Sequence, residues 1–288
     1  VGSAARLKEI YTMFFRKLLG VGGVLAIAIT LSISACSTDP SGTGTLQLNL
    51  VDAPAPIEGI ESIDIIFSFI SVHASADADS ANVGWIVVMD DQTSEAERTF
   101  NLLEYVNGTS ALLGEAELEE GHYTQLRIGI QSASITINGT TSDLTIPSGS
   151  QSGLKLTGGF NIDPNVITAI TLDFDAGESV RENPPGSGRY KLQPTIRMIE
   201  TILSGTISGT VTPDTLRTLI TAYETGTTTV VTSTYADTLS GEYMLQALLA
   251  GTYDLEASAE GFDVATEAGV TVTAGQDNPD HDFTLTES

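Results

Sequence analysis

Cysteine is almost absent from this chain of 288 residues, which contains a single one, Cys36. A disulfide needs two cysteines, so no internal disulfide can stabilise the fold. Burial of apolar side chains must do so instead. The part of the chain that follows Cys36 is long enough to form two hydrophobic cores.

Basic residues are also few: 12 lysines and arginines stand against 37 aspartates and glutamates, a net charge of −25 at pH 7. Proteins that bind nucleic acid neutralise phosphates with clustered lysine and arginine. The charge balance therefore excludes nucleic acid as an expected partner. Such acidity is typical of a well-solvated protein outside the cytoplasm.

Catalytic motifs are missing as well. The segment GSQSG at 149–153 resembles a nucleophile elbow, but Gln151 stands where the nucleophile is needed. An S-x-x-K pattern at 152–155 runs into strand-like sequence, whereas it belongs on a helix. The three histidines lack the H-E-x-x-H spacing of a zinc peptidase. We therefore expect a protein that is not an enzyme. The histidines are His73, His122 and His281.

One long hydrophobic run is present, LLGVGGVLAIAITLSIS at 18–34, directly after Arg16 and Lys17. A positive segment, an apolar stretch and small residues before a cleavage site are typical of a secretory signal. A membrane-spanning helix is the alternative, because the run reaches the roughly 17-residue minimum for crossing a bilayer. Its glycines and the polar sequence after it favour a signal peptide over residues 1–35, with translation expected to start at Met13.

The residues at the end of this run, Ile33-Ser34-Ala35-Cys36, resemble the lipobox of bacterial lipoproteins. The resemblance implies that Cys36 is diacylated, that the leader is cut before it, and that its new amino group is acylated. A thiol suits this role because it is nucleophilic. Several acyl chains, at about 0.8 kcal/mol per buried methylene, make a stable anchor. A buried free cysteine is the alternative, but no core-like sequence surrounds Cys36.

This lipobox predicts a membrane-anchored lipoprotein of the cell envelope. In a cell with two membranes, Ser37 after the cysteine resembles the pattern of outer-membrane lipoproteins. The polar residues 36–44 are rich in glycine, serine and threonine, which is typical of a flexible tether.

From Thr45 onward, β-branched or apolar residues recur at every second position, which is typical of strands. Asn138-Gly139 between two such segments predicts a tight hairpin. Residues 110–119 alone have a helix-like rhythm, which Gly114 weakens. The sequence therefore predicts an all-β chain.

A second series of short strands begins near Ser204. We expect two β-sandwich domains in series after the lipoprotein signal peptide, one at 45–200 and one at 204–288.

The first of these domains resembles the domain of unknown function 4382 family, found in secreted prokaryotic lipoproteins. That resemblance names the domain and implies no activity. The residues that carry it, in order, are GTLQLNL and VDAP at 44–54, Trp85, FNLL at 100–103, GHYTQLR at 121–127, IPSG at 146–149, LDFDA at 172–176 and LQP at 192–194.

The second domain resembles the carboxypeptidase regulatory-like domains, which are transthyretin-like β-sandwiches. The resemblance implies an accessory role in stabilising, spacing or binding. Some related adhesin repeats carry a Lys–Asn isopeptide bond, but no lysine follows Lys191. The matching residues are ISGTV at 207–211, GEYML at 241–245, Leu248, GTYDL at 251–255, Gly261-Phe262, Val270, Val272, Phe283 and Leu285.

Carboxylates cluster at two places in the sequence where they could bind a metal ion or act as acid and base. Asp173 and Asp175 alternate on one strand and share a face. Together with Asp52 and Glu178 they are a candidate calcium site, since calcium prefers oxygen ligands. A capping role of Asp52 and Asp173 in turns is the favoured alternative, and an acid–base pair is a weaker one. Near the end of the chain, the cluster Asp277, Asp280 and Asp282 reads as a solvated loop.

Tyrosines and the one tryptophan could stack on sugars, but most of them stand at expected core positions, where large aromatics dominate. Tyr223 and Tyr235 are the best placed for a glycan. We therefore expect a lipid-anchored binding or structural module that requires no cofactor and contacts a polysaccharide or another envelope protein. The alternatives are a carbohydrate-binding surface lipoprotein, calcium-dependent or not, and, as the weaker one, a hydrolase that uses Asp173 and Asp175.

Overall fold

The computed structural model describes residues 42–54, 57–75, 83–147 and 153–288, and their regular secondary structure is almost entirely β-strand, as predicted. They belong to one compact unit, Pro40–Ser288. Among these residues, no helix has the length and hydrophobicity needed to cross a bilayer. Cys36, the lipobox and the hydrophobic run lie outside the described residues.

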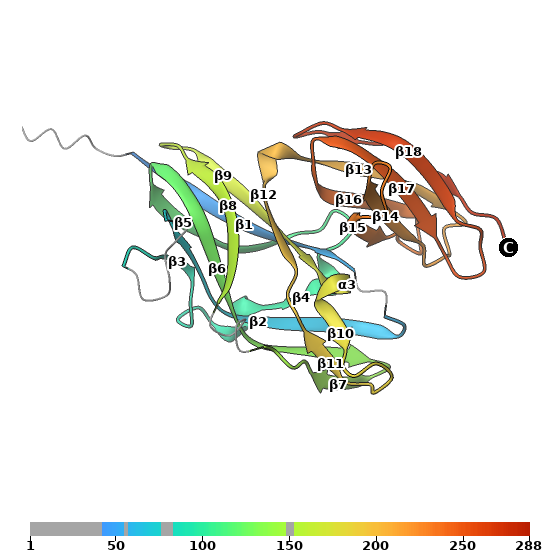
Figure 1. Ribbon diagram of the computed structural model, residues 1–288, viewed down its shortest axis with the longest axis horizontal. Helices are drawn as coiled ribbons and strands as arrows, with labels where there is room; N and C mark the ends of the chain where they lie inside the picture. The colour runs from blue at the N-terminus through green and yellow to red at the C-terminus, as the bar shows by residue number, and fades with distance from the viewer. Residues whose placement is uncertain (1–41, 55–56, 76–82, 148–152) are drawn as a thin grey trace, which may run out of the picture. The chain divides into compact units, whose positions relative to one another are not determined.

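The N-terminal module, from β1 to β12, contains two large sheets (Figure 1). In the first, the order is β12-β9-β1-β5, with β1 parallel to β9 and antiparallel to β5. In the second, the order is β3-β2-β6-β7, with β4 on β2 and β8 on β6. The strands of the first sheet are β1 (Thr43–Ala53), β5 (Ala111–Glu119), β9 (Ile167–Asp175) and β12 (Ile196–Glu200). The strands of the second are β2 (Ile60–His73), β3 (Ile86–Met89), β4 (Thr99–Asn101), β6 (Gly121–Ile137), β7 (Thr140–Asp143) and β8 (Leu154–Ile162).

Alternation places the core of this module between its two sheets. Leu46, Leu48 and Leu50 on β1 are buried and share one core with side chains of β2 and β6, such as Ile65 and Ile128. Successive strand residues point to opposite faces, so the period of two in the sequence becomes one apolar and one polar face. Remaining elements of the module are β10 (Val180–Glu182), which pairs with β11 (Tyr190–Leu192), and the short helices η1 (Glu95–Arg98), η2 (Leu102–Glu104) and α3 (Ala176–Ser179).

The C-terminal module, from β13 to β20, has two sheets around a separate core. One has the order β16-β13-β19 with β20 also on β13, and the other has the order β15-β14-β17-β18. A short helix, η3 (Thr201–Leu203), precedes the module. Its strands are β13 (Ser204–Thr212), β14 (Leu219–Glu224), β15 (Val230–Tyr235), β16 (Glu242–Leu249), β17 (Gly251–Ser258), β18 (Ala265–Val272), β19 (Asp277–Asn278) and β20 (Phe283–Thr284).

One element of the prediction was right in detail and one was wrong. Asn138 and Gly139 have φ of 48° and 71° and join β6 to β7, where Ile137 pairs with Thr140. This is the hairpin expected from the Asn-Gly pair. The helix-like segment 110–119 is instead strand β5, because pairing of this strand with β1 from one end to the other overrides a weak local preference.

Candidate functional site

The acidic residues proposed as calcium ligands lie around β1, β9 and α3. Asp52, near the end of β1, is buried, and its Oδ1 accepts a hydrogen bond from the Ala176 amide at 3.0 Å. Burial is the main reason why its pKa is raised well above the usual value, and its Oδ2 has no hydrogen-bond partner among the described residues.

Asp173 lies on the opposite face of the same sheet. In the parallel register, Asp52 pairs with Phe174, whereas Asp173 pairs with Val51, so the two carboxylates point to different sides. Arg197 on the neighbouring strand β12 forms an ion pair with Asp173, which is only 2% exposed. Desolvation by burial outweighs this arginine and raises the pKa of Asp173 to about 6.

Asp175 and Glu178 complete the predicted set, and both have local partners. The Glu178 amide donates to Oδ1 of Asp175 at 2.7 Å, which caps the first turn of α3. The Glu178 side chain forms an ion pair with Arg181.

In the described part of the chain, no group of three or more histidine, cysteine, aspartate or glutamate residues is placed to hold a metal ion. The four carboxylates therefore do not assemble into one calcium site. The capping role fits Asp52, which accepts from the Ala176 amide, but is wrong for Asp173, whose partner is Arg197. Asp175 is the residue that caps α3.

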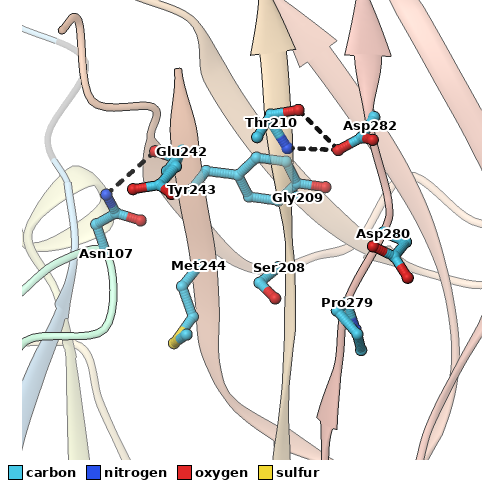
Figure 2. A pocket seen from close by; sticks show the side chains of 10 residues that line it. All are labelled: Asn107, Ser208, Gly209, Thr210, Glu242, Tyr243, Met244, Pro279, Asp280 and Asp282. Atoms are coloured by element: carbon cyan, nitrogen blue, oxygen red, sulfur yellow. Dashed lines mark hydrogen bonds between the residues drawn. The ribbon is translucent and has the colours of Figure 1, made fainter. Parts of the chain in front are cut away.

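A hollow of about 480 Å³ opens over β13 and β16 in the C-terminal module, and we call it the β13 hollow (Figure 2). Ser208 and Met244 pair across the two strands and point into it together. Pro279 and Asp280 line the side formed by the segment between β19 and β20. From the N-terminal module, the Asn107 amide lines the hollow and donates to the Glu242 carbonyl at 3.3 Å.

Asp282 holds the wall of the β13 hollow in place. Its Oδ1 accepts from the Thr210 amide at 2.7 Å and from the Thr210 hydroxyl at 2.8 Å (Figure 2). These hydrogen bonds lower the pKa of Asp282, so it stays ionised. Beside it, Tyr243 donates its hydroxyl to the His281 carbonyl at 2.6 Å. A side chain at Gly209 would meet that carbonyl oxygen at 2.1 Å, so the close approach of the segment between β19 and β20 to β13 requires glycine there.

The tail cluster was predicted to be a solvated loop before the last strand, and this is confirmed for Asp280 and Asp282, which are exposed and precede β20 directly. Asp277 is also exposed but belongs to the short strand β19. Asp277 accepts hydrogen bonds from the hydroxyls of Thr206 at 2.7 Å and Ser208 at 3.1 Å, and Asp282 binds Thr210. Both carboxylates thus fasten the tail to β13. The alternating hydroxyl residues of β13 are a sequence pattern that could have indicated these hydrogen bonds. Their aspartate partners, however, lie about 70 positions further along the chain.

The aromatic residues follow the expectation. Tyr123, Tyr243 and Tyr253 are buried in the two cores, whereas Tyr223 and Tyr235 are half-buried on the outer sheet face of the C-terminal module. The Arg217 guanidinium lies 3.9 Å from the centre of the Tyr235 ring and covers it.

Comparison with protein families agrees with this architecture. Residues 43–194, more than half of the chain, match the family described as a domain of unknown function, DUF4382. The chain belongs to the DUF4382 family. In this DUF4382 protein, residues 206–286 also match the carboxypeptidase regulatory-like domain, so both sequence resemblances are confirmed. None of the curated proteins compared with the chain matches it.

Solved structures show weaker likenesses to this DUF4382 protein. A chain in a type II cohesin–X–dockerin complex from Acetivibrio cellulolyticus is 20% identical over 29% of the present chain and 58% of its own, with a TM-score of 0.22. The Bacillus anthracis TIE protein is 9% identical over 85% and 34%, with a TM-score of 0.25. The minor pilin GBS52 of Streptococcus agalactiae is 12% identical over 84% and 96%, with a TM-score of 0.21. Likenesses at this level carry no inference about function.

Proposed function

We propose that this DUF4382 protein is a lipid-anchored, non-enzymatic component of the cell envelope that acts as a binding or structural module. The observation that carries the proposal is the single cysteine, placed at the end of a lipobox-like sequence after a charged and then apolar leader. Acyl chains on Cys36 would hold the module at a membrane, and residues 36–44 would let it move on a short tether.

The acidic residues support a non-enzymatic role. A hydrolase that uses two carboxylates needs both to reach the substrate. Asp173 is buried against Arg197, and Asp175 caps α3, so neither is a free acid or base. The partner is proposed to be an envelope polysaccharide or protein that contacts the C-terminal module.

Membrane fractionation of cells that make the Cys36→Ser variant tests the anchor. We expect the wild-type protein in the membrane fraction, and the variant either released from it or left uncleaved. A matched control is the double variant Cys36→Ser, Ser41→Cys, which restores a thiol in the tether but outside the lipobox and should behave like Cys36→Ser. Unchanged cleavage and membrane attachment of Cys36→Ser would contradict the proposal.

A further inference from the structure

A second hollow, of about 540 Å³, lies on the outer face of the β15-β14-β17-β18 sheet, and we call it the β17 hollow. Its volume falls within the range of about 300–1,000 Å³ for sites that take small ligands. Strand pairing places four residues of the hollow next to one another. Tyr223 on β14 pairs with Asp254 on β17, and Glu256 on β17 pairs with Thr266 on β18. Paired residues share a face, so these four side chains lie on the same outer surface.

Asp254 fixes the walls of the β17 hollow. Its Oδ2 accepts from the Gly226 amide at 2.8 Å, in the turn between β14 and β15, and its Oδ1 accepts from the Gly269 amide at 2.9 Å, in β18. The Asp254 carboxylate thus connects β17 to the turn between β14 and β15 on one side and to β18 on the other. Gly226 and Gly269 have φ of 72° and 76°, a backbone conformation that suits glycine. The hollow is therefore shaped before any ligand arrives, which reduces the entropy lost on binding.

The lining combines apolar and polar groups. Tyr223 is half-buried and donates its hydroxyl to Glu256 at 3.4 Å, and Val230 next to it is 49% exposed. Thr228 and Thr266 add exposed hydroxyl groups, which can both donate and accept hydrogen bonds. The lining thus offers ring and methyl surface beside carboxylates and hydroxyls.

Charge limits the class of ligand. Three carboxylates line the β17 hollow, and no lysine or arginine is among the described residues that line it. The chain as a whole carries a net charge of −25. Anionic ligands would meet repulsion without a counter-charge, which leaves neutral and cationic ligands. Between these, the half-buried tyrosine ring, valine methyls and threonine hydroxyls of the lining match a neutral ligand with an apolar face and hydroxyl groups.

We infer that the β17 hollow is a binding site for a neutral saccharide, whose apolar ring face contacts Tyr223 and Val230 while its hydroxyls donate to Glu256 and exchange hydrogen bonds with Thr266. A saccharide matches the lining because it has an apolar face and a rim of hydroxyls. The inference deepens the binding role proposed above and does not depend on lipid anchoring.

NMR titration of the chain from residue 37 to 288 with neutral oligosaccharides of glucose, xylose, mannose and N-acetylglucosamine tests this site. At least one of these should cause saturable chemical-shift changes centred on Tyr223, Val230 and Thr266. Tyr223→Ala should weaken that binding by at least about tenfold, because truncating an aromatic anchor commonly costs that much. The matched control is Tyr235→Ala on the same sheet face, which lies outside the hollow and should bind as the wild type does.

A second variant keeps the test decisive if Tyr223→Ala unfolds. Thr266 is exposed, so Thr266→Arg should fold and fill the hollow, and binding should be lost. The inference is overturned if none of the oligosaccharides gives saturable shifts, if the shifts map outside the hollow, or if a lysine-rich peptide binds there and the sugars do not. Membrane attachment through Cys36 is measured separately, so failure of the sugar site and failure of the anchor are distinguishable.

Discussion

Asp173 is the residue whose environment predicts a measurable effect of pH. Its pKa rises from the usual 3.8 to about 6 in the folded protein, mainly through burial. Between these two values the folded state binds a proton that the unfolded state has released. The free energy of unfolding should therefore fall as pH rises from about 4 to 6, by up to about 3 kcal/mol at 1.36 kcal/mol per pKa unit.

Urea denaturation of the wild type and of Asp173→Asn across this pH range measures the effect. The variant lacks the titrating carboxyl, so its stability should depend less steeply on pH, whatever its absolute stability. Asp52, whose pKa burial also raises, remains in both proteins and contributes a slope of the same sign. Parallel pH profiles for the two proteins would show that Asp173 does not titrate in this window.

The sequence does not indicate that the side chain of Gln125 is buried. It lies on β6, is 0% exposed, and neither its amide nitrogen nor its amide oxygen has a hydrogen-bond partner among the described residues. An unpaired buried amide costs about 1–3 kcal/mol. We expect Gln125→Met, which keeps the shape and removes the polar atoms, to raise the free energy of unfolding by about 1 kcal/mol.

Denaturant titration of Gln125→Met, with Gln125→Ala as the control that leaves a cavity, checks this. The alanine variant should be destabilised by roughly 2 kcal/mol or more, because the surroundings of a removed side chain relax only in part. A large loss of stability in the methionine variant would mean that the amide makes a bond that stabilises the fold.

At the scale of elements, the carboxylates of the tail connect the last strands to β13. Asp282 accepts two hydrogen bonds from Thr210, and a charged acceptor makes them roughly twice as strong as neutral ones. Asp282→Asn should therefore speed hydrogen exchange at the Thr210 amide and lower the melting temperature. Asp280→Asn is the matched control on the same segment, since asparagine tolerates its positive φ of 68° and no exchange effect is expected at Thr210. Equal exchange rates in the two variants would contradict this role.

Elements that depend on local pattern could be predicted, and those that depend on pairing could not. The alternation of Leu46, Leu48 and Leu50 becomes the buried face of β1, and the Asn138-Gly139 turn forms as expected. Strand β5 was predicted to be helix-like from the rhythm of residues 110–119, which strand pairing overrides. The opposite faces of Asp52 and Asp173 follow from the parallel register of β1 and β9, which the sequence does not reveal.

At the scale of the whole molecule, family and fold class could be predicted, whereas the hollows could not. The residues lining the β17 hollow come from β14, β15, β17, β18 and the turn between β14 and β15, so the site exists only once these strands have paired. Tyr223 was singled out because it falls outside the expected core positions. Asp254, Gly226 and Gly269, which shape the hollow, could not be recognised from the sequence, since their hydrogen bonds join residues that lie 28 and 15 positions apart along the chain.

The measurement that tests the account most directly is mass spectrometry of the N-terminal peptide of the protein extracted from membranes. The account predicts a chain that begins at Cys36 and carries acyl groups on its sulfur and its amino group, with nothing remaining of residues 1–35. An unmodified Cys36, or a chain that retains the hydrophobic run at 18–34, would contradict it.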